Sequence, residues 1–113
     1  MQLQIRTDGV EFVVSKEPQP KNDENGHQKA DRRTGELLFV TELVAMDDDG
    51  AEVIKVTTGG AAPEVGKRQM VTVTGLRVQH WAMDGRSGLT FRADSIIPVR
   101  SGAAVPSASG AGA

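Results

Sequence analysis

The stretch from residue 71 to residue 99 collects side chains whose types and spacing could bind a flat, negatively charged ligand. It holds the single tryptophan of the chain, Trp81, together with the arginines Arg77, Arg86 and Arg92. An exposed indole offers a surface on which an unpaired base stacks, and guanidinium groups follow phosphates. Because binding of a single-stranded nucleic acid requires both kinds of group, this stretch is the first candidate site.

The alternation of apolar and polar residues around Trp81 predicts a strand that brings these groups to one face. Successive side chains of a strand point to opposite sides of the sheet, so Arg77, Gln79 and Trp81 share a face. Thr90 and Arg92 of the next predicted strand would complete an outer patch, with the indole as the stacking surface. The residues expected in the core on the opposite face are Leu76, Val78, Leu89, Phe91 and Ala93.

Four further cations are candidates for contact with phosphates. Arg86 lies in the turn that follows Trp81, Lys55 lies on another predicted strand, and Arg32 and Arg33 lie in a long polar connection. Residues 66–100 carry six basic and two acidic residues, whereas residues 42–52 carry five acidic residues and no basic one. The net charge of −2 therefore conceals a basic region and an acidic region.

The main candidates also have purely structural interpretations. Trp81 precedes a turn and could instead cover one end of the sheet, as large aromatic side chains often do. Arg77 and Arg92 could pair with Asp94 or Glu42 across neighbouring strands, which would leave them on a solvated rim.

No arrangement of residues in the sequence is typical of catalysis or of a bound cofactor. The three consecutive aspartates at 47–49 lack the alternate spacing and the distant glutamate of a calcium loop. The glycines at 59–60 lack the Lys-Ser/Thr ending of a phosphate loop. Because the sequence shows no catalytic nucleophile together with a general base, we expect a binding protein. We expect no enzymatic activity, cofactor, metal or small-molecule substrate.

The apolar period is close to two along the chain, which predicts an all-β fold. The five expected strands are 10–15, 36–46, 51–58, 68–82 and 89–99. Gly75 interrupts the fourth strand, and a glycine there marks a bulge or a bend where a sheet curls. The prediction is a five-stranded antiparallel barrel resembling the oligonucleotide-binding fold (OB-fold), while an SH3-like barrel or an open sandwich remains an alternative.

Two segments stand apart from these strands. The polar connection 16–35 is long for a compact domain, which indicates either a functional loop or a solvated flap. Residues 101–113 are small and uncharged, so we expect a disordered tail after one domain that spans residues 1–100. The sequence has no cysteine, no signal segment and no run long enough to span a membrane, and we expect a soluble cytoplasmic protein.

Residues 65–97 resemble the C-terminal half of the barrel of bacterial single-stranded DNA-binding proteins. The matching residues are Val65, Gly66, Lys67, Val71, Val73, Gly75, Leu76, Trp81, Asp84, Gly85, Phe91, Ala93 and Ile96. The chain departs from that family at its opening, which lacks an apolar, basic first strand, and at its end, which lacks an acidic partner-binding tail. The overall layout is also similar to that of small accessory proteins of actinobacterial plasmids and integrative elements.

The resemblance implies a protein that binds single-stranded DNA without sequence specificity, in the replication or transfer of a mobile element. RNA remains open as a ligand. Stacking on an aromatic side chain contributes about 1–3 kcal/mol per base, so a single tryptophan favours a homo-oligomer, such as a dimer, over a lone protomer. The alternative is a protein-interaction module of a plasmid or phage system, which would use a sheet edge or an apolar patch at Leu37, Leu38 and Phe39.

Overall fold

The computed structural model describes residues 2–99 of the 113-residue chain, and this part is all-β. The predicted tail 101–113 lies outside the described residues. Eight strands form one sheet: β1 (Gln2–Gln4), β2 (Glu11–Pro20), β3 (Leu38–Asp47), β4 (Gly50–Gly59), β5 (Met70–Thr74), β6 (Arg77–Met83), β7 (Arg86–Arg92) and β8 (Ser95–Pro98). In residues 2–99 there is no helix of the length and apolarity needed to cross a membrane.

The predicted number of five strands is wrong, and the difference has a local cause. The fourth predicted strand is broken at residues 75–76 into β5 and β6, and the fifth is broken at residues 93–94 into β7 and β8. The short strand β1 is an addition that pairs with β6. The bend expected at Gly75 is therefore present, and a second bend at residues 93–94, which the sequence did not indicate, accompanies it in the paired strand.

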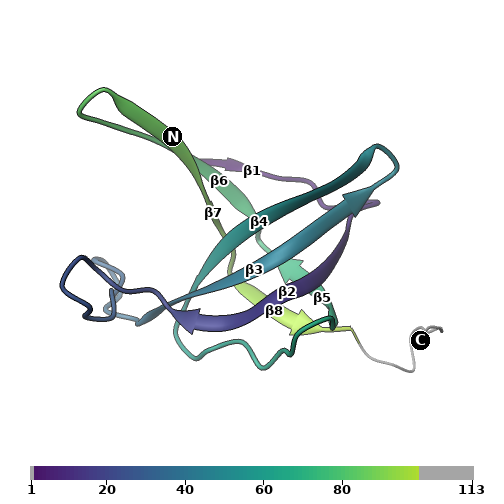
Figure 1. Ribbon diagram of the computed structural model, residues 1–113, viewed down its shortest axis with the longest axis horizontal. Coiled ribbons are helices and arrows are strands. Elements are labelled where there is room, and N and C mark those ends of the chain that lie inside the picture. The colour runs from purple at the N-terminus through teal and green to yellow at the C-terminus, as the bar shows by residue number, and fades with distance from the viewer. Residues whose placement is uncertain (1, 100–113) are drawn as a thin grey trace.

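The sheet curls into a half-barrel, with the strand order β1-β6-β7-β4-β3-β2-β5-β8 (Figure 1). All neighbouring strands are antiparallel except β4 and β7, which are parallel, so the prediction of a wholly antiparallel sheet is also wrong. The pair β6–β7 lies near one end of this order and the pair β5–β8 at the other end. The chain connects the two pairs directly, because β5 continues into β6 and β7 continues into β8.

The core lies on the inner face of the curled sheet and contains Leu76 and Ala93, as the alternation predicted. The prediction of Leu89 as a core residue is wrong, because it lies on the projecting hairpin of β6 and β7 and is exposed. Phe12 and Val14 of β2 are buried, and Val10 packs against them from the preceding turn. The other members of the buried apolar cluster are Leu43, Ile54, Val56, Val65, Val71, Val73, Leu76, Ala93 and Ile96. The apolar patch proposed at Leu37, Leu38 and Phe39 does not form, since Leu38 is buried while Leu37 is exposed.

Gly75 is the point at which the hairpin bends. It adopts a φ of +68°, and a Cβ atom at this position would overlap the carboxylate of Asp94. Nη1 of Arg77 donates to the carbonyl oxygen of Gly75 at 2.7 Å and to Oδ1 of Asp94 at 2.9 Å. The bend separates β5 and β8, which belong to the barrel wall, from the hairpin β6–β7, which we call the arm.

The connection between β2 and β3 is shorter and more ordered than the predicted segment 16–35. Residues 16–20 belong to β2, where Pro18 and Pro20 are tolerated because this part of β2 pairs with β3 alone. The remainder, loop 21–37, folds into two tight turns closed by bridges between Asn22 and Gln28 and between Ala30 and Leu37.

The bend predicts an unequal response of two glycines to substitution. Gly75→Ala places a Cβ in a left-handed conformation and against Asp94, so we expect the free energy of unfolding to fall by about 1–3 kcal/mol. Gly66 has open space around its Cβ position, and Gly66→Ala serves as the control with little change. Urea denaturation of both variants tests this, and an equal loss of stability in both would contradict it.

Candidate nucleic-acid interface

The pairing of β6 with β7 brings the predicted patch together on one face of the arm. Arg77 lies opposite Arg92, Gln79 opposite Thr90, and Trp81 opposite Gly88. Cross-strand partners point to the same side of a sheet, so these side chains share a face, as the alternation predicts. Phe91, on the other face, is partly buried against the core.

Trp81 is positioned by Gly88 and is open to solvent. A Cβ atom at Gly88 would lie 2.9 Å from Cζ2 of the indole, which means that the ring rests on the backbone of the neighbouring strand. The residue is nevertheless 42% exposed. Trp81 does not belong to the buried cluster, so the interpretation in which it seals one end of the sheet does not describe this structure.

Arg77 and Arg92 both form ion pairs, as the structural interpretation anticipated. Arg77 pairs with Asp94, one of the two partners expected for it. Arg92 pairs with Asp31 of loop 21–37, a partner that the sequence did not indicate. A guanidinium carries five N–H donors, so an ion pair with one carboxylate leaves others for a phosphate.

Asp31 connects loop 21–37 to the arm. Its Oδ1 accepts hydrogen bonds from the backbone N–H groups of Arg33 at 2.8 Å and Thr34 at 3.0 Å, and its Oδ2 accepts from Arg92. The hydrogen bonds from Thr34 and Arg33, followed by the contact with Arg92, lower the pKa of Asp31 to about 2. The carboxylate is therefore ionised at neutral pH and orients the loop against β7.

Lys21 is a candidate that the sequence analysis missed. It is half-buried directly after β2, and its Nζ donates to Oγ1 of Thr57 on β4 at 3.3 Å. Burial lowers the pKa of Lys21, and the nearby charges of Lys29 and Arg92 lower it further. Lys21, Lys29 and Arg92 thus form a cationic cluster where the loop meets β4 and β7. Of the three, only Arg92 is paired with a carboxylate in the described residues, that of Asp31.

The remaining predicted cations lie outside this cluster, on β4, in loop 21–37 and at the tip of the arm. Lys55 is exposed on β4, two residues from Thr57 and opposite Glu42, which accepts a hydrogen bond from Ser15 at 2.6 Å. Arg32 and Arg33 are exposed in the second turn of loop 21–37, and Arg86 is exposed at the tip of the arm. None of these three arginines forms a salt bridge within the described part of the chain.

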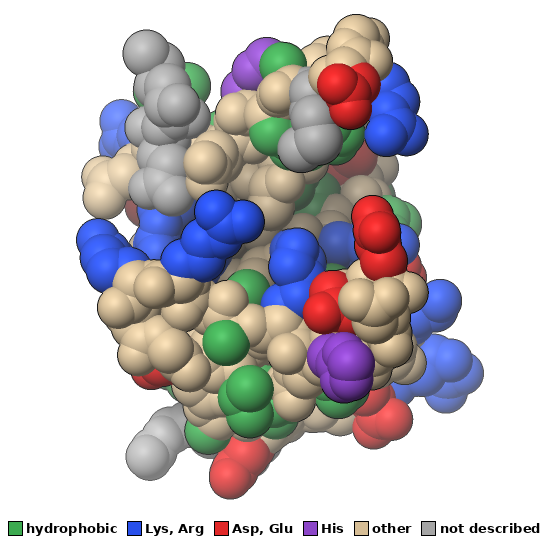
Figure 2. All heavy atoms as spheres, turned by 90° about the vertical axis from the view of Figure 1, so that its left-hand side faces the viewer, with side chains coloured by type: hydrophobic (Ala, Val, Ile, Leu, Met, Phe, Trp, Pro, Cys, Tyr) green, Lys and Arg blue, Asp and Glu red, His purple; other side chains and the backbone are tan. Residues whose placement is uncertain are grey.

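The arm and loop 21–37 project from the same side of the half-barrel, at the upper and lower left of Figure 1. Figure 2 views this side directly and shows Lys and Arg side chains in the band between the two projections, with Asp and Glu side chains beside some of them. A shallow hollow on β2, β3 and β4 is lined by the lysines Lys16 and Lys55 and also by the carboxylates of Glu17 and Glu42. This surface, from the arm across β4 to loop 21–37, is the candidate interface.

Among residues 2–99 no group of three His, Asp or Glu side chains is close enough to hold a metal ion.

Comparisons of the chain with known protein families, curated proteins and solved structures find no match. The functional assignment therefore depends on the residues and the geometry of the candidate interface.

The contact between Trp81 and Gly88 predicts a change in fluorescence. Gly88→Val would force the indole off the strand and into solvent, so we expect a red-shifted emission maximum and stronger quenching by acrylamide. Ser87→Val lies on the opposite face of the arm and is the control, with an unchanged spectrum. Because Trp81 is the single tryptophan, an unaltered spectrum in Gly88→Val would show that the ring does not rest on this strand.

The lowered pKa of Asp31 predicts an acid-sensitive link between the loop and β7. A carboxyl whose pKa falls from 3.8 to about 2 on folding stabilises the structure above about pH 4, and this contribution is lost as the pH falls toward 2. We expect the stability difference between wild type and Asp31→Asn to shrink over that range. A carbon-13 NMR titration of the Asp31 carboxyl with a midpoint near 3.8 would contradict the assigned contacts.

Proposed function

We propose that this protein binds single-stranded DNA without strong sequence preference, using the candidate interface of an OB-fold-like barrel. The observation that carries the proposal is the exposed indole of Trp81 on the same face as Arg77 and Arg92, next to the cluster around Lys21. Stacked bases and neutralised phosphates together account for sequence-tolerant binding of a single strand.

The positions of these residues in the sheet support the OB-fold interpretation. If β5–β6 and β7–β8 are each counted as one bent strand, the barrel has five strands: β2, β3, β4, β5–β6 and β7–β8. OB-folds bind oligonucleotides on the face of their second and third strands, between the loop joining strands 1 and 2 and the loop joining strands 4 and 5. Those elements correspond here to β3 and β4, loop 21–37, and the tip of the arm.

The ion pairs at the interface weaken the attraction for phosphate without abolishing it. Asp31 and Asp94 each offset one arginine, whereas Lys21 has only the neutral hydroxyl of Thr57 as its hydrogen-bond partner in the described residues. Lys29 and Arg92 lie close to Lys21, and of these three cations only Arg92 is paired with a carboxylate in the described residues. We therefore assign Lys21 the strongest phosphate contact and the two paired arginines a supporting one.

One indole per protomer limits the affinity for a strand. Since one stacked base contributes about 1–3 kcal/mol, we propose that a homodimer or a cooperative array places several protomers along the DNA. The resemblance to single-stranded DNA-binding proteins and to accessory proteins of mobile elements suggests a role in replication or transfer of such an element, inside the cytoplasm.

A titration with oligothymidine at low salt tests the proposal. We expect quenching of Trp81 fluorescence, tighter binding of single than of double strands, and affinity that falls with rising salt as counterions are released. In a mobility-shift assay, Trp81→Leu should weaken binding about 5- to 150-fold, which corresponds to about 1–3 kcal/mol.

Lys21→Gln should reduce the slope of log affinity against log salt by about 0.7, the value for one phosphate contact on a single strand. Lys67→Gln, an exposed residue of the connection between β4 and β5, is the matched control with an unchanged slope. Unchanged fluorescence together with no mobility shift at low salt would refute the proposed function.

A further inference from the structure

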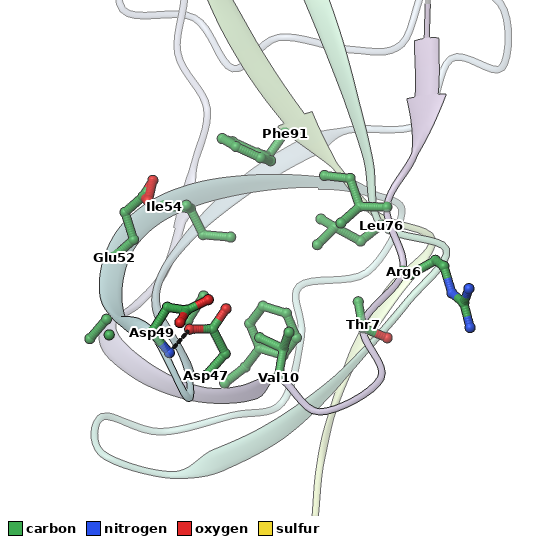
Figure 3. Close-up of a pocket in the computed structure, with 14 residues that line it drawn as sticks. Arg6, Thr7, Val10, Asp47, Asp49, Glu52, Ile54, Leu76 and Phe91 are labelled. Carbon is green, nitrogen blue, oxygen red and sulfur yellow. Dashed lines mark hydrogen bonds between the residues drawn. The ribbon is translucent and has the colours of Figure 1, made fainter.

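The half-barrel is open at the end that carries the β3–β4 turn. A cavity of about 360 Å³, open to solvent, lies there between the sheet and the segment that joins β1 and β2 (Figure 3). Its apolar lining includes Ile5, Val10, Phe12, Ile54, Leu76 and Phe91. We call this cavity and its rim the mouth.

The rim of the mouth is acidic. Figure 3 shows the carboxylates of Asp47 and Asp49 at the edge of the apolar space, while Arg6 points away from it. Asp47 accepts a hydrogen bond from the backbone N–H of Asp49 at 2.9 Å, which holds the turn in shape. Arg6 pairs with Asp8, and no described residue forms a salt bridge with Asp47, Asp49 or Glu52.

The charge of this end differs from that of the candidate interface. The β3–β4 turn and loop 21–37 lie at opposite ends of the view in Figure 1. Carboxylates repel phosphates, so the mouth does not extend a path for nucleic acid. An apolar cavity bordered by unpaired carboxylates is complementary to a group that is apolar at its centre and positively charged beside it.

We propose that the mouth docks a basic segment of a partner protein, with a bulky apolar side chain in the cavity and a neighbouring Lys or Arg at Asp47 and Asp49. A cavity of about 150 Å³ accepts a benzene ring, so this one has room for about two side chains of that size. The apolar anchor supplies affinity, and the carboxylates select a basic sequence around it. This inference does not depend on nucleic-acid binding.

The test uses three acetylated and amidated peptides with the full chain. Lys-Phe-Leu-Lys combines both features, Glu-Phe-Leu-Glu reverses the charge, and Lys-Ser-Ser-Lys removes the apolar side chains. By calorimetry we expect the first to bind at least about tenfold more tightly than either of the others. In nitrogen-15 NMR spectra it should shift the amide signals around the mouth, at residues 5–10 and 45–54.

Two variants separate the contributions of the cavity and its rim. Ala45 lines the cavity, and Ala45→Leu should fill part of it, while Asp49→Asn with Glu52→Gln removes charge from exposed positions. Each change should weaken binding of Lys-Phe-Leu-Lys about tenfold and leave oligothymidine binding as in the wild type. Glu64→Gln, exposed in the connection between β4 and β5, is the control and should bind normally.

Several results would overturn the inference. Equal binding of the three peptides, or no binding of Lys-Phe-Leu-Lys, would show that the mouth does not select a basic, apolar segment. Equally tight binding of phenethylamine would identify a small-molecule site instead. Self-association that the double charge variant abolishes would identify a second copy of the chain as the occupant. If Ala45→Leu fails to fold, the charge variant alone still decides the outcome.

Discussion

Gly75 takes a left-handed conformation in which the space of its missing Cβ is occupied by the Asp94 carboxylate, and Arg77 bridges the two residues. This contact joins the two bends of the long hairpin. It lets β5 and β8 remain in the barrel wall while the arm projects beyond it. The position of Trp81 depends on this bend, since an unbent hairpin would carry the indole in another direction.

A second contact between distant parts of the chain completes the candidate interface. Asp31 shapes the second turn of loop 21–37 with one oxygen and holds Arg92 of β7 with the other. The loop is thereby kept beside β4, where Lys21 reaches Thr57. The carboxylate of Asp31 that orders the loop also reduces the positive charge of the candidate interface.

Much of the candidate site follows from the sequence, because a strand has a geometric period of two. Alternation was enough to place Arg77, Gln79 and Trp81 on one face and Phe91 on the other. Gly75 indicated the bend at residues 75–76, whereas the break at residues 93–94 was not predicted, because it depends on the contact between Gly75 and Asp94. Lys21 was missed because Pro18 and Pro20 argue against a strand, and only the one-sided pairing of this part of β2 makes them acceptable.

The parallel pairing of β4 with β7 and the ion pair of Arg92 with Asp31 likewise depend on tertiary structure and could not be predicted from the sequence.

One surface, from the arm across β4 to loop 21–37, is proposed to bind the single-stranded DNA. Nitrogen-15 NMR mapping with oligothymidine tests it most directly. The account predicts shifted amide signals in loop 21–37, in β6 and β7, and around residues 55–57. Shifts confined to the mouth, or scattered evenly over the sheet, would contradict it.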